Sequence, residues 1–217
     1  MAKMDIDYTL YICTDSGLMS SKTVEQSVEA VLRGGATVIQ LREKNAGSRE
    51  LYELAKRVKA VTDRYNAPLI IDDRLDIALA VDAAGVHLGQ SDLPCAVARK
   101  LLGEGKIIGI TAPTVELAQA AERDGADYIG VGAMFATSTK MGAPANTKEN
   151  LAAIRAAVNM PIVMIGGVKR ANVLEFAGMG VNGAAVISDI IADPAPEAAA
   201  AEMREIMKKF RGMNYDR

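Results

Sequence analysis

The chain has 217 residues and a formal net charge of −2, with 50% hydrophobic and 24% charged residues, which is an ordinary globular composition. The chain has no basic excess, and with six Tyr, three Phe and no Trp it offers no surface for nucleic acid. No apolar run approaches the ~20 residues of a membrane helix, and the N-terminal residues do not form the apolar region of a secretory signal. Cys13 and Cys95 stand far apart, as reduced thiols of a cytoplasmic protein do, and the single histidine, His87, excludes a multi-histidine metal site.

The predicted elements alternate between short apolar runs and amphipathic segments. The apolar runs are predicted strands, and they span Thr9–Thr14, Thr37–Arg42, Leu69–Asp73, Gly85–Gly89, Lys106–Thr111, Tyr128–Gly132, Pro161–Gly166 and Gly183–Ser188. The segments in which apolar residues recur at three- and four-residue intervals are predicted helices. The main ones are Ser48–Tyr65, Thr114–Asp124, Thr147–Val158, Asn172–Met179 and Pro196–Phe210.

Residues that favour helix ends flank several of these segments. Ser48 and Thr147 are suited to cap a helix N-terminus with their hydroxyls. Gly34–Gly35, Gly125 and Gly180 follow helical segments, where a left-handed cap favours glycine.

The alternation predicts an α/β protein. Continuously apolar strands separated by helices indicate a parallel sheet covered on its faces. We count eight strands, each followed by a helix or helical turn, and no linker or change of composition divides residues 1–217. The prediction is therefore a single-domain (β/α)8 TIM barrel, with a doubly wound open sheet as the alternative. In such a barrel the active site lies at the carboxyl ends of the strands.

The second predicted strand leads into the most informative polar residues. Gln40, Arg42 and Lys44 alternate with other residues, so an extended backbone would direct all three side chains to one side. Two unpaired cations cannot lie in a core, so they must meet water, carboxylates or a multiply charged anion. The alternatives are a solvated strand end and a phosphate or pyrophosphate site.

The third and fourth strands end in carboxylates. Asp72 and Asp73 are adjacent, and Asp92 follows the next strand. Asp73 and Asp92 together could hold Mg²⁺, which prefers oxygen ligands. Alternatively, these residues cap the helices that follow, with Arg74 paired to Asp72 or Asp73. His87 lies within the fourth strand, where a hydrogen-bonded interior role and a catalytic role are both open.

The later strands supply two further candidate binding segments. Residues 133–146 form the longest connection without helical periodicity, and contain Thr137, Thr139 and Lys140, as a binding loop or an ordinary surface loop would. Gly166–Gly167 after the seventh strand, and a short helix expected to start near Ser188, form the frequent phosphate site of such barrels. One barrel mouth would thus hold two anion sites.

With these residues assembled, the chain resembles the thiamine phosphate synthase family over essentially its whole length. Each motif is weak alone, but their order and spacing together are specific. The matching motifs are Gln40-Leu41-Arg42-Glu43-Lys44, Asp73-Arg74, Gly85-Val86-His87-Leu88-Gly89-Gln90 with Asp92, Tyr128-Ile129-Gly130-Val131-Gly132, Thr137-Ser138-Thr139-Lys140, Ile165-Gly166-Gly167 and Val186-Ile187-Ser188.

The resemblance implies a transferase of thiamine biosynthesis with two small phosphorylated substrates. It would join hydroxymethylpyrimidine pyrophosphate to hydroxyethylthiazole phosphate, with pyrophosphate leaving first to give a pyrimidine methyl cation. The resemblance assigns pyrophosphate binding to Gln40, Arg42, Lys44 and Lys140, Mg²⁺ to Asp73 and Asp92, and the thiazole phosphate to Thr137, Thr139, Gly167, Ile187 and Ser188. Arg42, Lys44, Lys140 and Thr111 would be the catalytic residues, and the oligomeric state stays open, with a homo-oligomer among the options.

Four positions depart from the family pattern. The family usually has Asn where this chain has Asp72, and an ionised carboxylate cannot donate to pyrophosphate. Asp72, which is still assigned to the substrate site, must therefore contact the metal, be protonated or turn aside. Thr111 keeps the hydroxyl of the family's Ser, whereas Ala112 and Pro113 replace the usual Thr-His.

Three rival functions remain. A thiazole tautomerase resembles this chain but relies on a histidine where Ala112-Pro113 stands. A non-catalytic protein that binds thiamine precursors, disabled by Asp72, is the second rival. The third is a sugar-phosphate isomerase or epimerase, which would need no pyrophosphate substrate.

Overall fold

The computed structural model describes residues 5–136 and 146–215, and its core is a closed ring of parallel strands. Every strand pairs with its neighbours in chain order, and β1 pairs with β8 to close the barrel. The strands are β1 (Leu10–Cys13), β2 (Val38–Leu41), β3 (Leu69–Asp72), β4 (Gly85–Leu88), β5 (Ile107–Thr111), β6 (Tyr128–Val131), β7 (Ile162–Ile165) and β8 (Gly183–Val186). The predicted single-domain (β/α)8 barrel is confirmed, and the open sheet is wrong.

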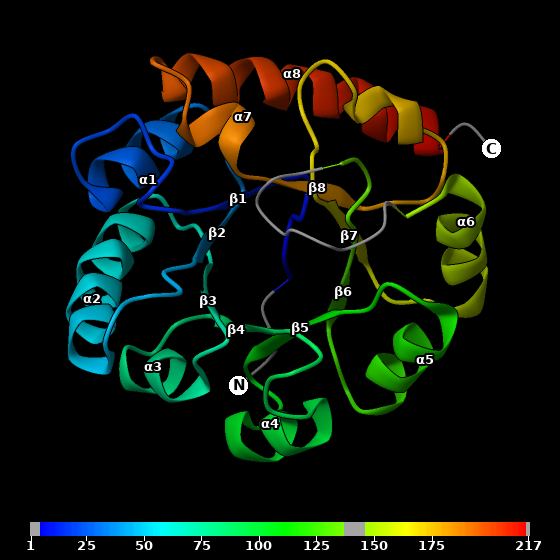
Figure 1. Ribbon diagram of the computed structural model, residues 1–217, viewed down its shortest axis with the longest axis horizontal. Coiled ribbons are helices and arrows are strands. Elements are labelled where there is room, and N and C mark those ends of the chain that lie inside the picture. The colour runs from blue at the N-terminus through cyan, green and yellow to red at the C-terminus, as the bar shows by residue number, and fades with distance from the viewer. Residues whose placement is uncertain (1–4, 137–145, 216–217) are drawn as a thin grey trace.

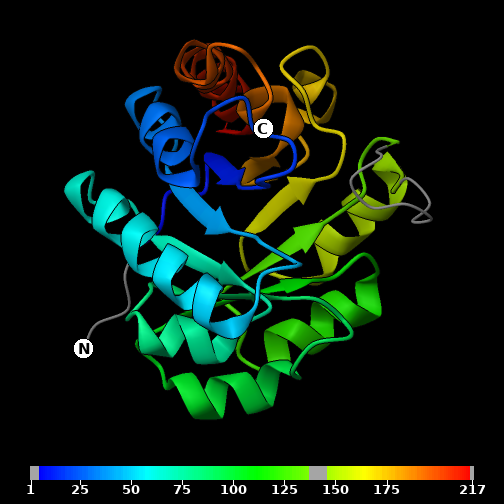
Figure 2. The same cartoon turned by 60° about the vertical axis from the view of Figure 1, so that its left-hand side comes forward.

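The helices form an outer ring around the strands (Figure 1), and Figure 2 shows the same arrangement from the side of α1, α2 and α3. They are α1 (Val24–Arg33), α2 (Ser48–Arg64), α3 (Leu75–Ala80), α4 (Cys95–Leu102), α5 (Val115–Arg123), α6 (Lys148–Ala157), the 3-10 turn η1 (Val173–Phe176), α7 (Ser188–Ile191) and α8 (Pro196–Tyr215). None of the helices in the described part of the chain is long and apolar enough to cross a membrane.

Two of the predicted helix features need correction. Ser48 does not cap α2, because Gly47 occupies the cap position and the Ser48 hydroxyl accepts a hydrogen bond from Arg74 Nη2 at 3.0 Å. The predicted helix 172–179 is only the 3-10 turn η1, because the Asn172 side chain bonds back to the preceding loop. The cap at Thr147 is confirmed, since its hydroxyl accepts from the Asn150 N–H at 3.1 Å.

The predicted glycine positions are largely confirmed. Gly35, Gly125 and Gly180 follow α1, α5 and η1 with φ values of 96°, 87° and 73°, in the left-handed region that favours glycine. Gly34 is different, because it has a right-handed φ of −72° at the C-cap of α1.

Alternation along the strands separates two hydrophobic cores. On β1, Leu10 and Ile12 belong to the large core between the strands and the helices, whereas Tyr11 and Cys13 belong to the smaller core inside the barrel. The same period of two directs the last inward residue of each strand toward the mouth of the barrel. The fold thereby gathers residues from all eight strands around a common space.

A glycine makes room for one of the large tyrosine rings inside the barrel. A Cβ on Gly109 would lie 2.1 Å from Cζ of Tyr128, so the ring of Tyr128 occupies the space that a side chain on β5 would take. Tyr128 in turn is 1% exposed. The inner face of the barrel is therefore shaped around a buried phenol.

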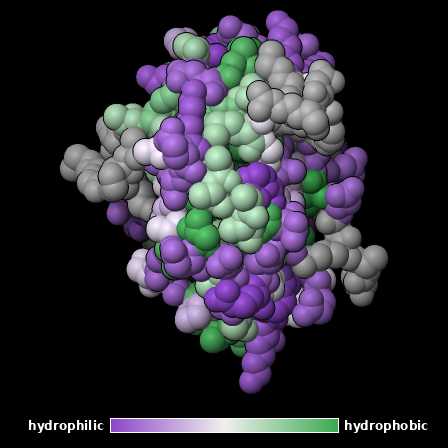
Figure 3. Space-filling view, turned by 90° about the vertical axis from the view of Figure 1, so that its right-hand side faces the viewer, coloured by the Kyte–Doolittle hydropathy of each residue, from purple (hydrophilic) through white to green (hydrophobic). Residues whose placement is uncertain are grey.

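The outer surface is mostly polar on the side of the barrel where α5 and α6 lie. Figure 3 shows the face on which α5 and α6 lie, where hydrophilic side chains cover most of the surface and hydrophobic ones gather in small groups. Scattered apolar side chains of this kind are normal on a folded protein.

Candidate active site

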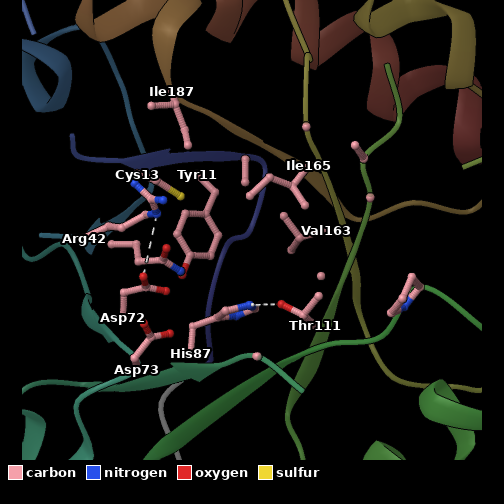
Figure 4. Close-up of a pocket in the computed structure, with 18 of the residues that line it drawn as sticks. Tyr11, Cys13, Arg42, Asp72, Asp73, His87, Thr111, Val163, Ile165 and Ile187 are labelled. Carbon is pink, nitrogen blue, oxygen red and sulfur yellow. Dashed lines mark hydrogen bonds and ion pairs between the residues drawn. The ribbon is translucent and has the colours of Figure 1, made fainter. Parts of the chain in front are cut away.

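The barrel mouth contains a cavity of about 680 Å³, large enough for a small-molecule substrate. Figure 4 shows that its charged side carries Arg42, Asp72 and Asp73, whereas Val163, Ile165 and Ile187 form an apolar wall. Because the lining residues come from the carboxyl ends of the strands and the loops that follow, this is the functional end of the barrel.

Gln40, Arg42 and Lys44 all line this cavity, as their alternation predicted. The strand itself ends at Leu41, so Arg42 and Lys44 lie on the loop after β2. Gln40 is buried, and its Nε2 donates to the Tyr11 hydroxyl at 2.9 Å. The alternative of a solvated strand end does not hold for Arg42, which is only 21% exposed and whose Nη1 pairs with Asp15 Oδ2 at 3.0 Å. Lys44 is 45% exposed, so its ammonium is partly solvated.

Asp72, the last residue of β3, points at the two cations. Its side chain is 9% exposed, and its Oδ2 lies 3.0 Å from Lys44 Nζ and 3.8 Å from Arg42 Nε. Figure 4 marks its contact with Arg42. Burial raises the pKa of Asp72, and the attraction of Lys44 opposes that rise without cancelling it. The carboxylate therefore competes for the cations that an anionic ligand would use.

Asp73 and Asp92 face each other across the loops after β3 and β4. Asp73 lies at the edge of the cavity, where its backbone has a left-handed φ of 58°. Its side chain forms an ion pair with Lys44. Asp92 Oδ2 accepts from the Gly89 N–H at 2.6 Å. Burial raises the pKa of Asp92, and the neighbouring Asp73 carboxyl raises it further. Such carboxylates are stabilised by a shared cation.

The carboxylates of Asp73 and Asp92 suit a magnesium ion whose other ligands come from water and substrate. Within residues 5–136 and 146–215, no three His, Cys, Asp or Glu side chains form a metal cluster. Mg²⁺ commonly takes one or two protein carboxylates and fills its other positions with water and substrate phosphate oxygens. Asp73 and Asp92 fit that type of site.

The helix-cap alternatives for these carboxylates are wrong. Arg74 occupies the cap position of α3 and Pro94 that of α4, and neither helix has a side-chain cap. Arg74 pairs with neither Asp72 nor Asp73, because its Nε donates to Asp76 Oδ1 at 2.9 Å.

A chain of hydrogen-bonded side chains forms the floor of the cavity. The hydroxyls of Tyr11 and Tyr128 are 2.8 Å apart, and the Tyr128 hydroxyl lies 3.0 Å from His87 Nδ1. His87 Nε2 lies 3.0 Å from the Thr111 hydroxyl, as Figure 4 marks. Burial raises the pKa of both tyrosines well above the usual value, so both stay protonated. The two phenols therefore add no charge to the floor of the cavity.

The ends of β7 and β8 form the opposite side of the mouth. Gly166 and Gly167 line the cavity with φ values of 91° and 68°. A Cβ on Gly167 would lie 2.8 Å from Cβ of Phe135, so only glycine fits there without a shift. Ile187 and Ser188 also line the cavity, and α7 starts at Ser188 as expected.

Three candidate residues cannot be placed. Thr137, Thr139 and Lys140 lie outside the described residues. Thr111 is placed at the end of β5 on the cavity wall, and Pro113 lines the cavity beyond it.

Several residues of the cavity were not predicted from the sequence. Tyr11, Cys13 and Tyr128 line the space, and Asp15 holds Arg42. Inward alternation on the first and sixth strands was a usable signal for the two tyrosines and the cysteine. Nothing in the sequence indicated that Asp15 would pair with Arg42, because the pair depends on the course of two loops.

Comparison with known proteins identifies the family. Residues 10–190 match the family model described as thiamine monophosphate synthase. The chain is 52% identical over 204 residues to a thiamine-phosphate synthase of Ruminiclostridium cellulolyticum, covering 94% of this chain and 97% of that protein. It is 50% identical over 202 residues to one of Clostridium beijerinckii, covering 93% and 97%.

A solved structure agrees with these relatives. The thiamine phosphate pyrophosphorylase from Pyrococcus furiosus superimposes with a TM-score of 0.86 at 41% identity, covering 94% of this chain and 97% of that one. Both the matched length and the identity are far above what a shared barrel fold alone requires. The chain belongs to the thiamine monophosphate synthase family.

Proposed function

We propose that this chain joins hydroxymethylpyrimidine pyrophosphate to hydroxyethylthiazole phosphate, forming thiamine phosphate and releasing pyrophosphate. One observation carries the proposal: a single cavity has two cations beside paired carboxylates on one side and a glycine-rich strand end on the other. That arrangement suits two phosphorylated groups held apart across a shared reaction space. Soluble substrates of this kind suit a cytoplasmic transferase.

The charged side of the cavity receives the pyrophosphate. Gln40, Arg42 and Lys44 line it, and Lys140, which lies outside the described residues, is assigned to the same group by family resemblance. Asp73 and Asp92 would hold Mg²⁺, which supplies positive charge to the leaving pyrophosphate. Because Arg42 and Lys44 are already ion-paired with Asp15, Asp72 and Asp73, an entering pyrophosphate must displace or share these contacts.

The bond changes follow from this placement. The carbon–oxygen bond to the pyrophosphate breaks heterolytically, and its electron pair leaves with the pyrophosphate, whose growing charge Arg42 and Lys44 stabilise. The thiazole nitrogen then donates its lone pair to the methylene carbon. No proton has to be removed for this bond to form, so the site needs no general base.

The remaining cavity residues position the two rings. The floor around Tyr11, Tyr128 and His87 offers hydrogen-bonding partners to the amino-pyrimidine, and Thr111 adds a hydroxyl at its edge. Val163 and Ile165 provide an apolar wall that keeps water away from the cation.

The second phosphate binds at the ends of β7 and β8. Gly167, Ile187 and Ser188 line that part of the cavity, with Thr137 and Thr139 assigned to the same phosphate by family resemblance. Glycine at a position with positive φ lets backbone N–H groups approach an anion closely.

Binding and turnover measurements test the proposal. Calorimetry with each substrate in the presence of Mg²⁺ should show binding, and mixing both should release pyrophosphate and thiamine phosphate in equal amounts. Tight binding of both substrates with no product would instead identify a non-catalytic binding protein.

A further inference from the structure

One arginine outside the cavity ties together the two segments that form its phosphate side. Arg170 lies on the loop after β7, and it is not among the described residues that line the cavity. Its backbone N–H donates to Asp189 Oδ2 at 2.9 Å, and its Nε donates to the same oxygen at 3.0 Å. Its Nη2 also donates to the Asp189 carbonyl at 3.2 Å. Loop and α7 are therefore joined through one residue pair.

Further carboxylates complete the surroundings of the guanidinium. Nη2 donates to Asp193 Oδ2 at 2.9 Å, just after α7, and Nη1 donates to Glu202 Oε2 at 2.8 Å on α8. The Arg170 side chain is 24% exposed, Asp189 16% and Glu202 60%. The contacts to Asp189 are thus the better-shielded part of the cluster, and the contact to Glu202 is the more exposed part. In Figure 1, α7 packs beside α8 above the ends of β1 and β8.

The loop that carries Arg170 is itself braced. Asn172 Nδ2 donates to the Gly167 carbonyl at 3.0 Å, and Asn172 Oδ1 accepts from the Lys169 N–H at 2.7 Å. The Asn172 side chain therefore links Gly167 to the part of the loop that carries Arg170. On the other side of the contact, Asp189 directly follows Ser188 at the start of α7.

We propose that Arg170, through Asp189, is a positioning residue that sets the spacing between Gly167 and Ser188 for the phosphate of the second substrate. The inference rests on the proposed function, which assigns that phosphate to these two residues. A phosphate gripped by two segments binds well only if both are held before it arrives, because ordering a loose loop costs binding free energy. Arg170 acts without touching the phosphate.

Substitutions at Arg170 separate positioning from a general loss of stability. Arg170→Ala should raise the KM for hydroxyethylthiazole phosphate about tenfold, which corresponds to ~1.4 kcal/mol. The KM for the pyrimidine pyrophosphate, whose groups lie across the cavity, should change less than twofold. Asp189→Ala should give the same split, and the double variant should be no worse than either single variant, because both remove one coupling.

Two variants serve as controls. Glu202→Gln removes the negative charge from the exposed contact to α8 and should leave both KM values unchanged. Arg170→Lys keeps a positive charge among the three carboxylates, so it stays folded if Arg170→Ala does not. It should raise the thiazole phosphate KM about threefold, since an ammonium cannot bridge the same set of acceptors.

Direct calorimetry of hydroxyethylthiazole phosphate, without the other substrate, completes the test. A loss of affinity for this substrate of about tenfold in Arg170→Ala and about threefold in Arg170→Lys supports the inference. Equal changes in the KM values for the two substrates would overturn the inference while leaving the proposed function intact. Unchanged KM values in both Arg170→Ala and Arg170→Lys would do the same. A wild-type protein that neither binds the thiazole phosphate nor forms product would overturn both.

Discussion

Replacing Asp72 with Asn should strengthen the binding of inorganic pyrophosphate, because it removes a competitor for Arg42 and Lys44. Asp72 Oδ2 lies 3.0 Å from Lys44 Nζ and 3.8 Å from Arg42 Nε. At an effective dielectric constant of ~20, charges at these separations attract by roughly 4 to 6 kcal/mol per pair before any cost of desolvation.

The net effect is much smaller than this gross attraction. Lys44 is 45% exposed, so water screens its contact, and burial opposes the charged form of Asp72, whose pKa is raised. If a quarter of the attraction of one such pair remains after screening and desolvation, its removal favours pyrophosphate binding by ~1.4 kcal/mol and lowers the Kd of pyrophosphate about tenfold. The same change should leave kcat intact or raise it.

Isothermal calorimetry with inorganic pyrophosphate at saturating Mg²⁺ measures the effect. Asp76→Asn is a matched control, since it makes the same change of charge at a residue that is 63% exposed and paired with Arg74 outside the cavity. Its affinity for pyrophosphate should stay within twofold of wild type. Unchanged or weaker binding in Asp72→Asn would refute the reasoning, and would show that Asp72 holds the cations in place or contacts the metal.

Two other predictions address catalysis and pH. Arg42→Ala should lower kcat/KM by about 10²–10³, because a partly buried cation is lost where charge develops and Asp72 loses a partner. As a control, Arg64→Ala removes an exposed ion pair with Glu29 and should leave kcat/KM within twofold of wild type. A near-wild-type kcat/KM for Arg42→Ala would exclude the role of this residue. Above pH 10 the free energy of unfolding should fall, because Tyr11 and Tyr128 lose their protons at the ordinary pKa of 10.0 only in the unfolded state. The folded state then binds more protons than the unfolded state, so stability decreases as the pH rises. Denaturant titrations that show no decline between pH 9 and 11 would contradict the burial of these phenols.

The barrel was predictable because its signals are local. Each strand and most helices have a short period of their own, and the alternation of Gln40 and Arg42 places side chains on one face whatever the rest of the chain does. The carboxyl-end rule then gathers residues from different strands without any knowledge of their contacts. For the same reason Asp73 and Gly167 were expected at the mouth, where they lie.

Contacts between distant segments were not predictable. The hydrogen bond between Tyr11 and Tyr128 joins residues 117 apart, and the direction of Asp72 depends on side chains from a neighbouring loop. Ser48 failed as a cap because Arg74, from another loop, takes its hydroxyl. Such choices follow from packing across the fold, which composition and periodicity do not contain.

The central claim is that the charged side of the cavity releases pyrophosphate as the two substrates are joined. The most direct test is the formation of thiamine phosphate from purified hydroxymethylpyrimidine pyrophosphate and hydroxyethylthiazole phosphate, with Mg²⁺ and after its removal by a chelator. We expect product only when both substrates and Mg²⁺ are present, and recovery when Mg²⁺ is added back. Absence of thiamine phosphate with both substrates at saturating Mg²⁺ would contradict the account.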